Sequence, residues 1–209
     1  MAKKQRLDKA IAMQGSLSRS EVKTLIRKGA VTVNGQVVKN ADFGVDFDSD
    51  TVAVQGKELS LSMHIYLMLN KPKGVVSASE DKKLPTVVDL VPKELWRKGL
   101  FPAGRLDKDT TGFVLTTDDG EFAHDILSPK KHISKTYHAL VNGTITDEMV
   151  EGFAKGVTIG EDFTLPASLK KISSEEQGDW GEVILKEGMY HQIKRMFGAY
   201  GLKVLELKR

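Results

Sequence analysis

The sequence predicts an α+β protein of two domains. A small helix-helix-hairpin domain over residues 1-60 is followed by a domain over residues 64-209 with a mixed, mainly antiparallel sheet. Three observations indicate this fold class. The 209 residues can form one mid-sized and one small domain, and the composition, 40% hydrophobic and 28% charged, is typical of globular proteins. The apparent strands also outnumber the helices, with short connections between them.

Two short helices are predicted first. The apolar spacing of "RLDKAIAMQG" indicates a helix that begins near Arg6 and closes at Gly15. In "SLSRSEVKTLIRKG", Ser18 and Glu21 have the spacing of a capping box, and Gly29 ends the second helix. Because residues four apart share a helix face, the Lys and Arg residues of the second helix lie opposite its apolar stripe.

A β-hairpin follows the two helices. In "AVTVNGQVV" the valines alternate on both sides of Asn34-Gly35, and Asn-Gly in this setting is the strongest short-range hairpin signal. The segment "DFGVDFDSDTVAVQGKEL" adds acidic turns and one more strand. We place the domain boundary at "SLSMH", directly after it.

The second domain begins with "HIYLMLNKPKGVVSAS", which predicts a buried strand, a turn and a second strand. Lys71 and Lys73 of the turn form a basic pair that faces an approaching ligand. A strand centred on Tyr137, a helix in "TDEMVEGFAKGV" and strands around "ASLKKI" and "GEVILKEG" come next. The final "GMYHQIKRMFGAYGLKVLELKR" predicts a helix that begins near Tyr190, followed by a strand.

Positive charge collects at the two ends of the chain. Residues 1-39 contain nine Lys and Arg against two acidic residues, and residues 186-209 contain six against two, so the middle is acidic. Basic ends are common in proteins that bind a polyanion, because neutralised phosphates release counterions. A solvated Lys-rich face would give the same count.

Several classes of chemistry are excluded or disfavoured. The chain has no cysteine, which removes disulfides, thiolate nucleophiles and Cys-ligated metals. The three histidines at positions 132, 138 and 191 lack metal-ligand spacing, so we expect no metal site. The N-terminus has no apolar signal core, and the longest apolar stretch, "HIYLMLN", is too short to span a bilayer. We therefore expect a soluble, cytoplasmic protein.

The segment "FPAGRLDKDTTGFVLTTDDGE", residues 101-121, carries the first candidate for catalysis. Asp107 follows Gly104 and Arg105, which places a carboxylate at a loop crest with a cation two residues away. Such a carboxylate can be a nucleophile or an acid-base group. A capping or turn Asp has the same local pattern, and the aspartates at positions 109, 118 and 119 are interpreted as turn residues.

Two further candidates have structural alternatives. Tyr137 alternates with His138 on its strand, as a half-buried strand aromatic also does. Lys194 and Arg195 lie in the last predicted helix. The sequence is equally consistent with a functional role for this pair and with two solvated surface side chains.

The first sixty residues resemble the S4-like RNA-binding domain, first known from a ribosomal small-subunit protein. The matching residues are "RLDKAIA", "SRSEVKTLIRKGAVTVNG" and the Val-rich hairpin. Phosphate contacts from such a domain position an RNA without reading its sequence. The alternative is a helix-hairpin unit whose basic residues only maintain solubility. The expected RNA-binding residues of the whole chain are Arg6, Lys9, Arg19, Lys23, Arg27, Lys28, Lys71, Lys73 and Arg195.

The rest of the chain resembles the bacterial pseudouridine synthases of the RsuA type, which act on small-subunit (16S) ribosomal RNA. Four motifs agree in order and spacing: "LNKPKG", "GRLDKDTTGFVLTTDDGE", "SPKKHISKTYHALV" and "EGMYHQIKRMF". The same RNA-binding domain precedes the catalytic domain in that family. Thr110-Thr111 and "YHQIKRMF" are closer to the small-subunit enzyme than to its large-subunit relatives. The family usually continues past "ELKR", whereas this sequence stops at Arg209.

The resemblance implies a function for each matching residue. The reaction detaches uracil from ribose, turns it and rejoins it through carbon, and no cofactor is needed. Asp107 matches the essential aspartate, which acts as the nucleophile or assists glycosidic cleavage by abstracting a sugar proton. Lys194 matches its basic partner, which holds the carboxylate ionised. Tyr137 matches the tyrosine that packs on the target base and serves in removing a proton, and Arg105 helps to hold the base flipped out.

The leading hypothesis is therefore an RNA-uridine isomerase. Its expected partner is ribosomal RNA, either free small-subunit RNA or an assembly particle. We expect it to act as a monomer and not to bind membranes. One alternative is a related synthase acting on large-subunit RNA. Another is a non-catalytic RNA-binding assembly factor, against which the joint presence of Asp107, Tyr137 and Lys194 argues. A glycosidase is disfavoured because no second carboxylate at the required separation is identifiable.

Overall fold

A computed structural model describes residues 4–15, 17–128 and 131–209, so Pro129 and Lys130 of "SPKKHISK" lie outside the described residues. The chain divides into two compact units. The N-terminal unit contains Met1–Tyr66, Val88–Phe101 and Thr117–Asp119, and the C-terminal unit contains Leu67–Val87, Pro102–Thr116 and Gly120–Arg209. The expected boundary between residues 60 and 64 stays a prediction, because the N-terminal unit also contains two later segments.

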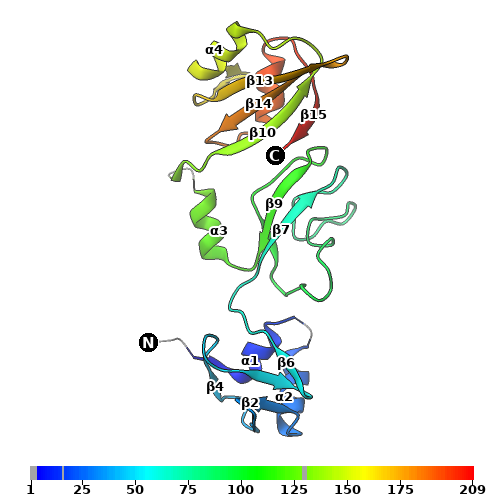
Figure 1. Ribbon diagram of the computed structural model, residues 1–209, viewed down its shortest axis with the longest axis vertical. Coiled ribbons are helices and arrows are strands. Elements are labelled where there is room, and N and C mark those ends of the chain that lie inside the picture. Colours follow the sequence, from blue (N-terminus) through cyan, green and yellow to red (C-terminus); the bar gives the residue numbers. More distant parts are fainter. Residues whose placement is uncertain (1–3, 16, 129–130) are drawn as a thin grey trace. The chain divides into compact units, whose positions relative to one another are not determined.

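The N-terminal unit confirms the predicted order of helix, helix and hairpin (Figure 1). Ser18 and Glu21 form a complete capping box at the start of the second helix. A four-stranded antiparallel sheet has the order β3-β2-β5-β6, and β1 pairs with β4. The elements are β1 (Gln5–Arg6), α1 (Leu7–Ala12), α2 (Arg19–Arg27), β2 (Val31–Val33), β3 (Gln36–Val37), β4 (Gly44–Val45), β5 (Val52–Val54) and β6 (Lys57–Leu59).

Apolar residues of α1, α2 and the sheet form the core of this unit. Leu7, Val22, Ile26 and Val31 are among its fully buried members. The predicted Asn-Gly turn joins β2 to β3, with both residues at positive φ as the tight hairpin requires. Local sequence signals therefore account for most of this unit.

Two main sheets and a small hairpin are described in the C-terminal unit. The first has the order β7-β9-β8, from β7 (Tyr66–Lys71), β9 (Gly112–Thr117) and β8 (Phe101–Ala103), and α3 (Gly120–Leu127) follows it. The second is antiparallel with the order β13-β14-β10-β15. Its strands are β10 (Lys135–Val141), β13 (Ser168–Glu175), β14 (Gly178–Leu185) and β15 (Val204–Lys208), while β11 (Thr158–Ile159) and β12 (Asp162–Phe163) form a small hairpin.

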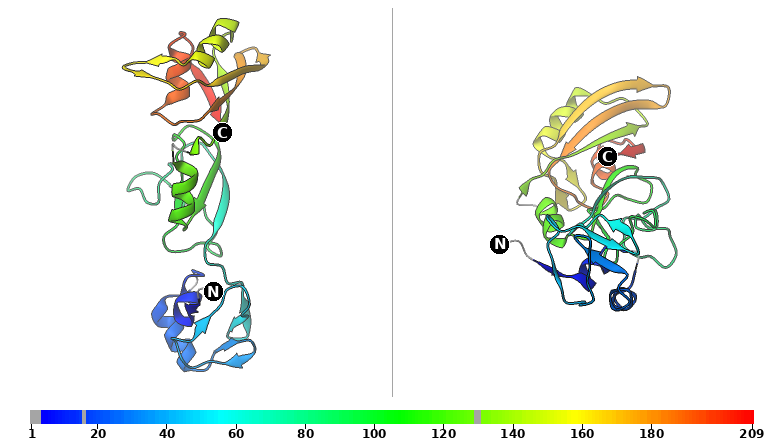
Figure 2. Two further views of the ribbon diagram at one scale, coloured as in Figure 1. Left: turned by 90° about the vertical axis from the view of Figure 1, so that its left-hand side faces the viewer. Right: turned by 60° about the horizontal axis from the view of Figure 1, so that its bottom comes forward.

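Helices α4 (Asp147–Lys155) and α5 (Gln192–Gly198) pack together on the second sheet (Figure 2). The rings of Phe153 and Phe197 lie 5.1 Å apart between centroids and belong to the core of this unit. Ile193, Met196 and Phe197 are buried, so α5 has a defined inner face and a defined outer face. This packing fixes which side chains of α5 project from the core.

Two predictions about secondary structure were wrong. Residues 75-78 do not form a strand; only an isolated bridge joins Val76 to Thr86, because this segment bonds to neighbouring loops instead of a sheet. Helix α3 was missed, since Asp119-Gly120 was interpreted only as a turn, whereas the helix begins at Gly120. Among the described residues, no helix is both long and apolar enough to cross a membrane.

Candidate active site

Asp107 lies on the loop between β8 and β9, where three backbone hydrogen bonds tie the end of the loop to the C-terminal strand. Thr111 donates to Leu207 at 3.0 Å, Arg209 donates to Thr111 at 3.0 Å, and Phe113 donates to Arg209 at 3.0 Å. Gly112 has a φ of 107°, and any side chain there would collide with the backbone of Arg209. The glycine therefore permits the close approach that fixes the loop.

The peptide units on both sides of Asp107 are also anchored. The Ser77 hydroxyl accepts from the Leu106 backbone N–H at 3.0 Å and donates to the Leu106 carbonyl at 3.1 Å. The Lys108 carbonyl accepts from the Gly74 N–H at 2.8 Å and from the Lys71 ammonium at 3.2 Å. The backbone can thus present the Asp107 side chain in a fixed direction.

The expectation that Lys71 contacts RNA was wrong. Its side chain is fully buried, and its ammonium also donates to the carbonyls of Val75 at 2.7 Å and Pro72 at 3.0 Å. Burial lowers the pKa of Lys71, and the charges of Asp109 and Asp107 oppose that effect. All three hydrogen bonds of the ammonium go to backbone carbonyls, so Lys71 supports the loop and is not available to a ligand.

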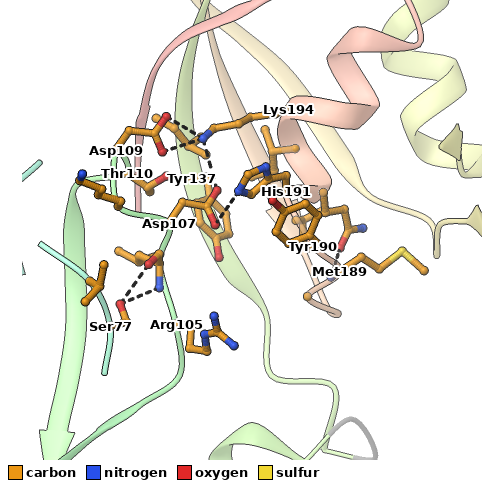
Figure 3. Close-up of a pocket in the computed structure, with 18 of the residues that line it drawn as sticks. Ser77, Arg105, Asp107, Asp109, Thr110, Tyr137, Met189, Tyr190, His191 and Lys194 are labelled. Carbon is orange, nitrogen blue, oxygen red and sulfur yellow. Dashed lines mark hydrogen bonds and ion pairs between the residues drawn. The ribbon is translucent and has the colours of Figure 1, made fainter. Parts of the chain in front are cut away.

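Helix α5 directs Lys194 toward the two aspartates of this loop (Figure 3). Its Nζ lies 3.3 Å from Oδ2 of Asp107, as the sequence predicted for this pair. The same Nζ lies closer to Asp109, at 2.7 and 2.8 Å from the two carboxylate oxygens. The interpretation of Asp109 as a turn residue alone was therefore wrong, because its carboxylate binds Lys194.

The electrostatics of this cluster follow from the shared lysine. Burial lowers the pKa of Lys194, but the hydrogen bond to Asp109 and the charges of both aspartates outweigh burial and raise it. The hydrogen bond from Lys194 lowers the pKa of Asp109. Lys194 is thus charged over the whole physiological pH range and faces two carboxylates.

Tyr137 projects from β10 into the same pocket (Figure 3). Burial raises the pKa of its phenol, the charge of Arg209 opposes this, and Asp107 adds to it. The hydroxyl is therefore protonated near neutral pH. A neutral aromatic ring beside Asp107 offers a flat surface on which a base can pack.

Two pocket residues were not selected from the sequence. His191 was noted only as lacking metal-ligand spacing, yet its Nε2 lies 3.5 Å from Oδ1 of Asp107. The ring of Tyr190 stacks on it at 3.9 Å between centroids. The spacing of His191 and Lys194, three residues apart at the start of a helix, is the signal that could have indicated a shared face.

Two further predicted residues of this unit, Arg105 and Arg195, form no described contact with Asp107. Arg105 lines the pocket and lies apart from the group formed by Asp107 and Lys194 (Figure 3). Arg195 binds the carbonyl of Ile159 and the carboxylate of Asp162 at 3.2 Å, which ties α5 to the β11–β12 hairpin. Its side chain is one-third exposed, so contact with RNA stays a prediction.

The pocket has a volume of about 690 Å³, which is in the range of sites that hold a nucleotide-sized ligand. Its floor combines an anchored carboxylate, a lysine, a tyrosine and a histidine. Such a set can hold a base, ionise a carboxylate and move a proton. Within the described part of the chain, no group of three or more His, Asp or Glu side chains could hold a metal ion.

In the N-terminal unit, three of the predicted RNA-binding cations converge on one buried carboxylate. The Asp8 side chain is fully buried; Arg19 approaches it at 2.9 Å, Arg6 at 3.1 Å and Lys23 at 3.8 Å. Burial raises the pKa of Asp8, but hydrogen bonds from Arg19 and Arg6 outweigh burial and lower it to about 2. The three cations are about half exposed, so each retains a surface for a ligand.

The other predicted cations of this unit lie at the surface. Arg27 lines a hollow of about 360 Å³ together with Arg6 and Lys23. Lys9 and Lys28 are exposed. In the C-terminal unit, Lys73 is half exposed and lies 3.5 Å from a carboxylate oxygen of Glu206.

Comparison with protein families gives two matches on this chain. Residues 65–199 match the family described as RNA pseudouridylate synthase, and residues 5–52 match the S4 domain. The first match contains all the residues of the cluster around Asp107, and the second contains Asp8 and its three cations.

Individual relatives cover nearly the whole chain. An uncharacterized RNA pseudouridine synthase of Bacillus subtilis (strain 168) is 43% identical over 98% of this chain and 86% of its own. Ribosomal small subunit pseudouridine synthase A of Escherichia coli (strain K12) is 43% identical over 98% of this chain and 87% of its own. Ribosomal large subunit pseudouridine synthase B of B. subtilis (strain 168) is 38% identical over 98% and 84%.

A solved structure agrees with these sequence matches. The crystal structure of a pseudouridylate synthase has 36% sequence identity to this chain and a TM-score of 0.61, over 98% of this chain and 86% of that one. The similarity extends through both units.

Proposed function

Because this chain belongs to the RNA pseudouridylate synthase family, we propose that it isomerises a specific uridine of small-subunit (16S) ribosomal RNA to pseudouridine, with Asp107 as the catalytic nucleophile. The observation that supports the assignment of Asp107 is its anchorage. Both neighbouring peptide units are held by internal hydrogen bonds, and the carboxylate faces Lys194 in a pocket of nucleotide size.

The proposed reaction uses an ionised Asp107. Its carboxylate attacks the nucleoside, or it assists glycosidic cleavage by abstracting a sugar proton; both routes need the negative charge that the Lys194 ammonium stabilises. The C1′–N1 bond breaks, the uracil turns, and its C5 forms a bond to C1′, while any bond to Asp107 breaks again. The proton on C5 leaves to solvent and N1 takes up a proton, so the atoms balance and label at C5 is released. Oxidation states do not change, so the proposal requires no cofactor.

Tyr137 and Arg105 act on the base in this proposal. The neutral ring of Tyr137 lies beside Asp107 and packs on the flipped uracil. Because its hydroxyl is protonated near neutral pH, packing is favoured over service as a base. Arg105, at the edge of the pocket, helps to hold the base outside the RNA stack.

The basic residues of the N-terminal unit position the RNA through its phosphates. Arg6, Lys23 and Arg27 line one hollow together with Asp42, which is ion-paired with Arg6, so three cations face one carboxylate and a net positive charge remains for a phosphate. Lys9, Arg19, Lys28, Lys73 and Arg195 complete the proposed RNA-binding set. A substrate in the ribosome or its assembly particles places the protein in the cytoplasm, where it acts as a monomer.

The small-subunit substrate is favoured by one comparison. The relative named for the small subunit is 43% identical to this chain, against 38% for the relative named for the large subunit. Action on large-subunit RNA is therefore the second candidate, and parallel assays on both RNAs distinguish the two.

Tritium release from RNA labelled at carbon five of uracil tests the proposed function. The wild-type protein should release tritium from unmodified small-subunit transcript or particles, and Asp107→Asn should release none, because the amide cannot act as nucleophile or base. Asp125→Asn, which changes an exposed carboxylate on α3, is the matched control and should behave as wild type. Release by Asp107→Asn at the wild-type rate would contradict the assignment of Asp107.

A further inference from the structure

His191 has a left-handed backbone conformation, which is uncommon for residues other than glycine, although histidine adopts it more often than most of them. It is the residue directly before α5, with φ 48° and ψ 35°, in the left-handed region. For most residues other than glycine this conformation is strained, and such strain persists only where the surrounding structure imposes it. The conformation therefore needs an explanation.

The neighbouring side chains impose this conformation. Gln192 is buried; its Oε1 accepts from the Met189 N–H at 2.9 Å, and its Nε2 donates to Glu187 at 2.6 Å. Glu187 also accepts from the Leu165 N–H at 2.8 Å. These bonds close the loop before α5 into one shape and leave His191 little freedom.

The consequence of this shape is the direction of the imidazole ring. His191 Nε2 lies 3.5 Å from Oδ1 of Asp107, while Lys194 Nζ lies 3.3 Å from Oδ2 (Figure 3). The ring of Tyr190 also stacks on the imidazole, with 3.9 Å between the ring centroids. Each oxygen of Asp107 thus faces its own nitrogen donor.

Lys194 alone cannot fix the carboxylate of Asp107. Its ammonium lies closer to both oxygens of Asp109 than to Asp107, so its charge and its donors are divided. A carboxylate held at one oxygen can rotate about its Cβ–Cγ bond. A second donor at the other oxygen removes that rotation.

We propose that His191 is a positioning residue for Asp107. In this proposal, which rests on the proposed function above, the Nε2–H group of His191 holds Oδ1 and keeps the carboxylate in the orientation that meets the nucleoside. Both the neutral ring protonated at Nε2 and the imidazolium supply this donor. Each carboxylate oxygen retains a lone pair for the substrate.

Three substitutions separate the donor from the backbone conformation. His191→Gly and His191→Asn suit the left-handed backbone, but neither places a donor near the position of Nε2. His191→Gln fits that backbone less well, yet its amide nitrogen reaches close to the position of Nε2. A purely structural role predicts that Gly and Asn retain activity best, whereas a donor role predicts that Gln does.

The experiment measures single-turnover tritium release and RNA affinity for the three variants. We expect release to fall at least about tenfold in the Gly and Asn variants and to stay within about threefold of wild type in the Gln variant. RNA affinity should change by less than about twofold in all three. His138→Asn is the matched control, because His138 lies at the same 3.5 Å from a carboxylate, Glu182, on the outer face of β10.

The outcomes distinguish this inference from the proposed function. The inference is overturned if the Gly and Asn variants release tritium as fast as wild type, if Gln is no faster than Asn, or if the loss is one of RNA affinity. If wild type is active, Asp107→Asn is inactive and all His191 variants equal wild type, only the inference fails. If wild type itself releases nothing, the proposed function fails and this inference with it.

Discussion

The buried ammonium of Lys71 connects β7 to the loop that carries Asp107. The ammonium donates hydrogen bonds to the carbonyls of Pro72, Val75 and Lys108. Among the described residues, the carbonyl of Val75 accepts no hydrogen bond from any other donor. Carbonyls that lose a buried partner cost free energy, because water does not replace the lost bond. Lys71 thus supports the loop at Lys108, the residue next to Asp107.

Replacing Lys71 by methionine should destabilise the C-terminal unit by about 1–3 kcal/mol, since similar volume is kept and the donor is lost. Urea unfolding in a Trp96→Phe background, which leaves Trp180 of β14 as the single tryptophan of the sequence, measures this change by fluorescence. Lys73→Met, at a half-exposed position in the same turn, should change the free energy of unfolding by less than about 0.5 kcal/mol. Equal effects of the two substitutions would contradict the support by Lys71.

Asp107 and Lys71 differ in how far the sequence predicted them. The motif around Asp107 resembles that of a known family, and this resemblance implied the pairing of Asp107 with Lys194, which is present. Lys71 and Lys73 look alike in the sequence, and only the fold decides that one is buried. The contact of His191 with Asp107 depends on a loop closed by Gln192, and composition alone gives no sign of it.

At the scale of elements, α1 and α2 are joined by the ion pairs around Asp8. The carboxylate of the first helix binds Arg19 at the start of the second helix and lies 3.8 Å from Lys23. These ion pairs hold the basic side of α2 in place. Asp8 therefore contributes both to the stability of the N-terminal unit and to the arrangement of its cations.

The pKa of Asp8 sets the pH at which this stabilisation is lost. The pKa is lowered to about 2 from its ordinary value of 3.8, so the stabilisation is complete above about pH 4 and disappears as the pH falls toward 2. It is worth at most about 2 kcal/mol, less a discount for its half-exposed partners.

Asp8→Asn tests this contribution. Amide hydrogen exchange of α1 and α2 should be faster in the variant than in wild type at pH 5, and the difference should shrink as the pH falls toward 2. Asp48→Asn, at an exposed position of the same unit, is the control. A difference that stays constant down to pH 2 would show that the ion pairs do not stabilise the unit.

Elements with strong local signals were predicted well. The capping box of α2 and the Asn-Gly hairpin both lie within a few residues, and both are present. The segment after the Lys-Pro-Lys-Gly turn has the composition of a strand but is held by Pro85 and Leu106, which are remote in sequence. Helix α3 was not predicted because its first residue, Gly120, is also the second residue of Asp119-Gly120, which was interpreted as a turn.

At the scale of the whole molecule, the candidate active site combines segments far apart in the sequence. Asp107 lies on a loop, Tyr137 on strand β10 and Lys194 on helix α5. Because α5 packs on the sheet that contains β10, Tyr137 and Lys194 line the same pocket. Most of the proposed RNA-binding cations belong to the other unit. In the proposed function, the N-terminal unit positions the RNA and the C-terminal unit carries out the chemistry.

Charge reversal in the N-terminal unit tests this division of roles. Arg27→Glu and Lys28→Glu avoid the network around Asp8 and should weaken RNA binding, while single-turnover release at saturating RNA stays unchanged. The slope of log affinity against log salt should become shallower by about 0.7–1 for each phosphate that the protein no longer neutralises. Lys155→Glu, at an exposed position of α4, is the control. Unchanged affinity and slope would remove these residues from the RNA interface.

Mapping the position of pseudouridine tests the proposed substrate and mechanism together. The protein is incubated with unmodified small-subunit and large-subunit RNA, each supplied as a free transcript and as an assembly particle. Chemical marking of pseudouridine followed by primer extension gives its position. The account predicts one new pseudouridine in small-subunit RNA with wild-type protein and none with Asp107→Asn. A site only in large-subunit RNA would contradict the assigned substrate, and a site formed equally by Asp107→Asn would contradict the proposed mechanism.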